Sequence, residues 1–130
     1  MQEYDSIKQL FSREPKVDAV YLFGSRAYNK HKKDSDIDLA LATNDPNYFA
    51  NNKLKLLTEL VKIGYERVDL VEITTADLTL TYQALKPNKP LYVKPGFDRN
   101  ELYSKMIRMY FHFEYILTIC NQGLKERLQR

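Results

Sequence analysis

The chain has 130 residues and a mass of 15.4 kDa, with 44% hydrophobic and 28% charged residues, a balance typical of one folded domain and not of a disordered chain. Its formal net charge of +3 is too small to indicate a nucleic-acid-binding protein. The single cysteine excludes a disulfide within the chain, and no apolar run approaches the roughly 20 residues that cross a bilayer. We therefore expect a cytoplasmic protein with no membrane partner and no direct contact with nucleic acid.

Apolar residues recur along the chain with helical and extended spacing in alternation. Helical spacing predicts helices over residues 2–13, 54–64, 76–86 and 98–130. Runs rich in valine, leucine, isoleucine and aromatic residues predict strands over residues 17–23, 37–42, 67–74 and 91–93. Asn51 or Asn52 is the expected N-cap of the second helix, and the flanking prolines place the last strand at a sheet edge. The order indicates a single α/β (α+β) domain over residues 1–130, with a mixed sheet, flanking helices and a long C-terminal helix.

Two carboxylates open the second predicted strand. Side chains alternate along a strand, so Asp36 and Asp38 leave the same face about 7 Å apart along the chain. Charges about 4 Å apart repel by on the order of 4 kcal/mol at an effective dielectric of about 20, and a cation between them relieves this repulsion. Oxygen ligands without histidine or cysteine favour Mg²⁺ or Mn²⁺. The alternative is a solvated strand end that binds nothing.

A third acidic residue and a glycine turn extend this pattern. Asp69 lies on the third predicted strand and joins the pair if that strand is a neighbour, although Glu72 is an alternative on the same strand. Gly24 follows the first strand and lets the backbone approach a ligand closely, while the Ser25 hydroxyl and the next N–H groups can hold a phosphate. Taken alone, a Gly-Ser pair is an ordinary turn. The combination indicates a nucleotide site.

The motifs that carry this pattern resemble the signature of a known family. FGSRA at 23–27 and DSDIDLA at 34–40, with ten residues between Gly-Ser and Asp-x-Asp, are similar to the minimal nucleotidyltransferases (MNT group) of the DNA polymerase β-like superfamily. VDLV at 68–71 resembles the strand that bears the third carboxylate of that family. The resemblance covers nearly the whole chain and is most specific up to residue 40. One departure is Tyr28-Asn29-Lys30, where family members often have a glycine.

The resemblance implies a DNA polymerase β-like fold and transfer of a nucleoside monophosphate, usually AMP from ATP, to a hydroxyl with release of pyrophosphate. Asp36 and Asp38 would bridge two Mg²⁺ ions, with Mn²⁺ as an alternative, since two metals can clamp the attacking and leaving oxygens. Asp69 would bind the catalytic metal and help to deprotonate the acceptor. The nucleotide-binding residues would be Gly24, Ser25 and Arg26.

The acceptor is expected to lie in a shallow cleft or to be presented by another protein, because 130 residues leave no room for an acceptor-binding domain. The chain is similar to the antitoxins of HEPN/MNT pairs, which would make the partner a HEPN ribonuclease toxin that is neutralised by AMP addition to a tyrosine. Two alternatives stay open: a module that neutralises its partner by binding alone, and a nucleotidyltransferase that acts on a small molecule or an RNA end. Homo-oligomerisation is open as well.

The C-terminal helix carries more apolar residues than one buried face requires. A stripe at helical spacing is expected to pack on the sheet of this chain, with Cys120 as a small core residue, and the remaining aromatics are candidates for a partner interface. The stripe consists of Leu102, Met106, Met109, Phe113, Leu117, Cys120, Leu124 and Leu128. Basic residues predominate after residue 85. Together with Lys30, Lys32 and Lys33 they could serve nucleic acid or an acidic partner. The favoured interpretation is that these three lysines balance the nearby aspartates and steer ATP toward them.

Overall fold

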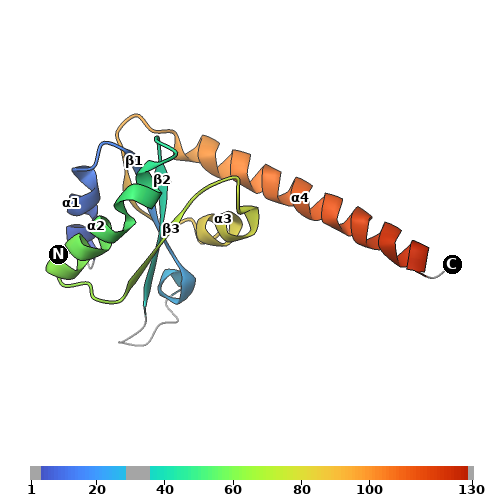
Figure 1. Cartoon of the computed structure of the whole chain (residues 1–130). Coiled ribbons are helices and arrows are strands. Elements are labelled where there is room, and N and C mark those ends of the chain that lie inside the picture. The colour runs from blue at the N-terminus through green and yellow to red at the C-terminus, as the bar shows by residue number, and fades with distance from the viewer. Residues whose placement is uncertain (1–3, 29–35, 129–130) are drawn as a thin grey trace.

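A mixed sheet of four strands is the centre of the computed structural model, which describes residues 4–28 and 36–128 (Figure 1). The strand order is β3-β2-β1-β4, with β2 and β3 parallel and the other pairs antiparallel. In chain order the elements are α1 (Asp5–Ser12), β1 (Val17–Phe23), the short 3₁₀ helix η1 (Gly24–Tyr28), β2 (Ile37–Thr43), α2 (Tyr48–Lys62), β3 (Val68–Glu72), α3 (Leu78–Leu85), β4 (Pro90–Val93) and α4 (Arg99–Leu128). The expected architecture is confirmed, with β4 at an edge. The lysines expected to steer a nucleotide, Lys30, Lys32 and Lys33, lie outside the described residues.

Neighbouring side chains of β2 point to opposite faces of the sheet. Leu39 and Leu41 of β2 face a cluster that α1 and α2 cover, while Ala40 and Ala42 face a second cluster formed with α3 and the first turns of α4. This alternation follows from the two-residue period of a strand. On the second face the large ring of Tyr21 of β1 is fully buried beside these alanines.

Helix α2 makes the parallel pairing of β2 and β3 feasible. Parallel strands need a crossover of a dozen or more residues, and α2 supplies 15. Its side chains Leu56 and Leu60 are fully buried in the larger cluster. The crossover therefore contributes to the core as well as to the connection.

Helix α2 begins at Tyr48, several residues before the predicted start. The Tyr48 side chain is buried, and its hydroxyl donates a hydrogen bond to the Glu14 carboxylate at 3.0 Å. The expected N-caps Asn51 and Asn52 therefore lie inside the helix, where the Asn52 amide donates to the Tyr48 carbonyl at 2.9 Å. The prediction of the cap was wrong because the burial of one aromatic ring, and not a capping side chain, fixes the first turn.

Helix α4 packs on the domain only along its first turns. Leu102 and Tyr103 contact the second cluster, and Met106 is the one buried side chain among its described residues. Beyond residue 110 the helix extends away from the sheet (Figure 1). The prediction that the whole stripe packs on the sheet was wrong, and so was the prediction that Cys120 is a core residue, since this cysteine is exposed.

We name residues 111–128 the apolar arm, because large hydrophobic side chains on this stretch are exposed. They are Phe111, Phe113, Tyr115, Ile116, Leu117, Ile119, Leu124 and Leu128. Helical spacing predicted that four of them, Phe113, Leu117, Leu124 and Leu128, belong to a core stripe, but spacing alone does not say whether the sheet of the same chain or another molecule covers them. Across the described ranges, no helix combines the length and the apolar character that crossing a membrane requires.

Two leucines on α2 test the packing of this helix. Leu56 is fully buried, whereas Leu54, two residues earlier, is 78% exposed. We expect Leu56→Ala to lower the free energy of unfolding by about 2–5 kcal/mol, because it leaves a cavity under the sheet. Leu54→Ala should change it by no more than about 0.5 kcal/mol. Urea denaturation measures both, and equal losses would contradict the packing of α2 described above.

Candidate active site

The sheet brings the Gly-Ser turn and two of the carboxylates to one end of three adjacent strands. Phe23, the last residue of β1, pairs with Asp38 of β2, and Asp38 pairs in turn with Asp69 of β3. Gly24 follows directly after Phe23 and opens η1. Asp38 and Asp69, which are 31 positions apart in the sequence, therefore become immediate neighbours.

Asp38 and Asp69 lie on the face of the sheet that α3 covers. Ala40, two residues after Asp38, and Val71, two residues after Asp69, both contact the cluster that contains α3. Glu72 is out of phase with Asp69 and pairs at the far end of β2 with Leu41. The register thus places Asp69, and not Glu72, beside Asp38. Asp36 lies just before β2 and is exposed.

Position 24 requires a glycine because the Asp38 carboxylate lies against its backbone. A Cβ atom at Gly24 would overlap the Oδ2 atom of Asp38 and come within 3.2 Å of its Cγ. The φ angle of Gly24 is +71°, a left-handed conformation that glycine adopts without strain. The carboxylate of Asp38 therefore lies directly against the backbone of the turn. Any side chain at this position would displace the carboxylate.

The three acidic residues are coupled electrostatically. The pKa of Asp38 is raised above its ordinary value, first because the carboxyl is partly buried and then because of the charges of Asp69 and Asp36. A cation at this point would relieve that repulsion, and the donors are all oxygens, so the residues fit Mg²⁺ or Mn²⁺. Within residues 4–28 and 36–128, however, no three acidic, histidine or cysteine side chains gather closely enough to form a ready-made metal cage.

A pocket of about 310 Å³ lies beside the turn. It is lined by Phe23, Gly24 and Tyr28 on one side and by Gln83 and Lys86 of the α3 segment on the other. Sequence analysis identified Gly24 but missed Gln83 and Lys86, which belong to no motif and reach the turn only because α3 packs on this face. Tertiary packing alone reveals them.

The other two residues of the turn have different exposure. Ser25 is exposed and Arg26 is half-buried, both within η1. They follow Gly24 directly and so lie at the same end of the sheet as the pocket. Their position is compatible with the predicted contact with a nucleotide, which remains a prediction.

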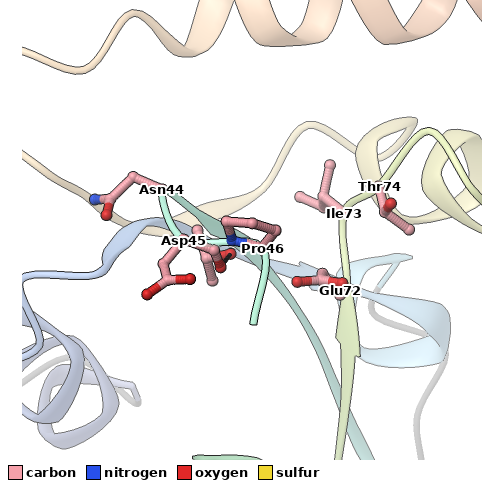
Figure 2. A pocket seen from close by; sticks show the side chains of 7 residues that line it. Asn44, Asp45, Pro46, Glu72, Ile73 and Thr74 are labelled. Atoms are coloured by element: carbon pink, nitrogen blue, oxygen red, sulfur yellow. Dashed lines mark hydrogen bonds between the residues drawn. The ribbon is translucent and has the colours of Figure 1, made fainter. Parts of the chain in front are cut away.

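A second pocket, of about 330 Å³, lies at the opposite ends of β2 and β3 and is shown in Figure 2. Its walls are the segments 43–46 and 72–74. The acidic residue Asp45 is already satisfied there, since its carboxylate lies 3.3 Å from the Lys16 ammonium and accepts the Asn47 backbone N–H at 3.0 Å. These contacts cap the turn before α2. The pocket is separate from the carboxylate pair.

Acidic side chains on adjacent strands, a glycine turn against one of them and an adjoining pocket are suited to enzymes that transfer a group from a nucleoside triphosphate. Comparison with known proteins identifies the class further. The family model for polymerase beta nucleotidyltransferases matches residues 5–95, and the chain belongs to this family. It is therefore a nucleotidyltransferase, which confirms the activity class that the motifs implied.

Its relatives are minimal members of that family. The chain is 33% identical over 116 residues to the protein adenylyltransferase MntA of Shewanella oneidensis, with 88% of this chain and 81% of that protein covered. A crystal structure of a toxin–antitoxin with AMP-PNP is 28% identical, covers 100% of both chains and has a TM-score of 0.66. The complex of a tri-AMPylated Shewanella oneidensis HEPN toxin with its MNT antitoxin is 27% identical, covers 98% of this chain and 96% of that chain, and has a TM-score of 0.60. The resemblance to the MNT group and the DNA polymerase β-like fold class are thus confirmed.

The raised pKa of Asp38 predicts how stability depends on pH. Folding disfavours the ionised form of Asp38, so the wild-type protein loses stability as pH rises through the raised pKa. At neutral pH Asp38 is ionised, and the whole of this loss of stability is present. We expect Asp38→Asn to raise the melting temperature at about pH 7. This gain should shrink as pH falls through the raised pKa and vanish below 3.8, the ordinary value, where the wild-type carboxyl is protonated in both the folded and the unfolded state.

Asp45→Asn is the control of opposite sign. The Asn47 backbone N–H and Lys16 lower the pKa of Asp45, so its ionised form stabilises the fold at neutral pH. This variant should lose stability at neutral pH, and the loss should vanish as pH falls through the lowered pKa. Melting curves across the acidic range measure both. A destabilised Asp38→Asn at neutral pH would contradict the coupling of the carboxylates.

Proposed function

We propose that this protein transfers AMP from ATP to a tyrosine hydroxyl of a HEPN-type ribonuclease and thereby neutralises it. The observation that carries the proposal is the register that sets Asp38 beside Asp69, with Gly24 against the Asp38 carboxylate. The relatives support it, since one is named a protein adenylyltransferase, one was crystallised with AMP-PNP and one is bound to an AMPylated HEPN toxin. We place this activity in the cytoplasm, whose reducing conditions suit the exposed free thiol of Cys120.

Each residue of the site has a role in this reaction. Asp36, Asp38 and Asp69 would hold Mg²⁺, which when bound would neutralise charge on the phosphates during in-line displacement. Gly24, Ser25 and Arg26 would position the triphosphate. The tyrosine oxygen forms a bond to the α-phosphorus as the bond from that phosphorus to the pyrophosphate oxygen breaks. Asp69 would accept the tyrosine proton, and pyrophosphate leaves.

The apolar arm is the surface we propose for the partner. Soluble monomers rarely expose a large continuous apolar patch, and such patches mark interaction sites. The arm carries aromatic side chains, including Phe111, Phe113 and Tyr115, a residue type enriched in protein interfaces. Binding there would hold the ribonuclease on the same molecule as the nucleotide.

The arm also supports a second candidate function. A long exposed apolar helix suffices to bind and block a partner without any chemistry, so a purely neutralising module is the rival. The carboxylates argue against it. A protein that acts by binding alone does not need two acidic residues paired on adjacent strands beside a glycine turn.

A pair of glycine variants tests whether the contact between Gly24 and Asp38 serves nucleotide binding. Mg²⁺ with ATP should raise the melting temperature of the wild-type protein, because both bind only the folded state. Gly24→Ala should abolish this rise, since its Cβ displaces the Asp38 carboxylate. Gly96→Ala is the control: its φ of +87° imposes similar strain, but nothing lies within 4 Å of the added Cβ. Equal retention of the rise in both variants would contradict the assignment.

A carboxylate double variant separates catalysis from binding. Asp36→Asn/Asp38→Asn should fold and bind the ribonuclease but fail to protect cells from it, because these side chains serve the reaction and not the apolar arm. Mass spectrometry of the ribonuclease should show added AMP on a tyrosine with the wild-type protein and none with the double variant. Glu72→Gln, which removes a carboxylate at the opposite end of β2 and β3, should behave as wild type.

The reciprocal variant is Leu117→Ser/Leu124→Ser, on exposed positions of the apolar arm. It should retain the Mg²⁺–ATP melting shift and lose binding to the ribonuclease. Full protection by the carboxylate double variant, with no change in the mass of the ribonuclease, would establish the binding module in place of the enzyme.

A further inference from the structure

An aromatic cluster joins α3 to α4 beside the pocket and belongs to neither buried core. The rings of Tyr82 and Tyr110 are stacked, with centroids 4.0 Å apart and planes inclined by 4°. Phe111 packs edge-on against both rings, at 5.8 and 5.6 Å. Aromatic pairs in such geometry contribute beyond the area that they bury. The cluster therefore fixes the side chain of Tyr82 from the side of α4.

Tyr82 in turn holds a lysine at the pocket. Lys86 follows it by one helical turn, its backbone N–H donates to the Tyr82 carbonyl at 2.9 Å, and its ammonium lies 5.8 Å from the centroid of the Tyr82 ring. A cation at this distance from an aromatic face is attracted to it. Among the residues that the structure describes, no carboxylate lies within ion-pair distance of Lys86.

The position of Lys86 at the pocket indicates the function of its positive charge. It lines the pocket of about 310 Å³ opposite Gly24, and it is the one cationic residue among the described residues that line this pocket. The site also presents the carboxylates of Asp36, Asp38 and Asp69, which repel a triphosphate in the absence of a cation. An ammonium on a flexible stem is a common phosphate ligand in nucleotide sites.

Resting on the proposed function, we propose that Lys86 binds the triphosphate of the nucleotide in this pocket and that the stacked Tyr82–Tyr110 pair positions it. Lys86 is then a binding residue, whereas Tyr82 and Tyr110 are positioning residues that act through it. The ring of Tyr110 is itself held by its contacts with Tyr82 and Phe111. The root of the apolar arm and the nucleotide pocket are thus connected by three side chains.

The binding of three ligands to Lys86 variants tests the first half of the proposal. Titration calorimetry with Mg²⁺ and ATP, GTP or inorganic tripolyphosphate should show that Lys86→Gln weakens all three by roughly 10- to 100-fold. Lys86→Arg, which keeps the charge, should stay within about threefold of wild type. Lys89→Gln, which removes an exposed charge three residues away, should have no effect.

Tyrosine variants test the positioning role. Tyr110→Leu should raise the KM for ATP several-fold and leave kcat for AMP transfer unchanged, while Tyr110→Phe, which keeps the stacked ring, should match wild type. In the Lys86→Gln background, Tyr110→Leu should cause no further loss, because the two side chains act through one contact. Additive losses would show that the stack acts on the fold and not through Lys86.

Other outcomes overturn the proposal. Unchanged affinity of Lys86→Gln for all three ligands would remove Lys86 from the site and leave the proposed function intact. Altered discrimination between ATP and GTP with unchanged tripolyphosphate binding would assign Lys86 to the base instead of the phosphates. If the wild-type protein bound none of the three ligands, the proposed function would fail together with this inference.

Discussion

The parallel pairing of β2 with β3 is the constraint on which the site depends. It holds Asp38 and Asp69 side by side on one face of the sheet, where partial burial of the Asp38 carboxyl and then the charge of Asp69 raise the pKa of Asp38. The opposite face maintains this arrangement, because Leu39, Leu41 and Leu70 are fully buried there. Burying several leucines contributes a few kcal/mol each, at about 25 cal/mol per Å² of apolar area, which exceeds the repulsion between partly solvated carboxylates. The free protein therefore keeps these carboxylates close together despite their repulsion. Binding of a cation between them is favoured because it relieves that repulsion.

Alternate residues of β2 belong to the two faces of the sheet. Leu39 and Leu41 lie in the cluster under α1 and α2, whereas Ala40 and Ala42 lie in the cluster that contains α3 and Tyr21 of β1. Because α3 packs on this second face, its end, with Gln83 and Lys86, lies against the turn at Gly24. One strand therefore contributes both to the main core and to the face on which the pocket lies.

Much of this fold can be predicted from local patterns, because strands and turns leave short-range signals. The bounds of β1 at Val17 and Phe23 match the sequence prediction, since an apolar run ends there at a glycine. The position of Asp69 beside Asp38 could not be derived locally: strand order is decided by the crossover and not by either strand. The start of α2 at Tyr48 and the exposure of the apolar arm were missed for a similar reason, because both depend on which surface covers an apolar side chain. The roles of Asp36, Asp38, Asp69, Gly24, Ser25 and Arg26 remain predictions.

Because α4 is long, the way it is attached to the domain determines where its C-terminal end lies. At 1.5 Å per residue, the 18 residues of the apolar arm reach about 27 Å beyond the last turn that contacts the domain. A tilt of about 10° at that turn moves the end of the helix by about 5 Å. A small change in the angle between α4 and the domain therefore gives a larger displacement at its C-terminal end. The stacked rings of Tyr82 and Tyr110 lie at this last contacting turn. The packing of these two rings would therefore set how close to the carboxylates a molecule lies when it is bound near the C-terminal end of α4.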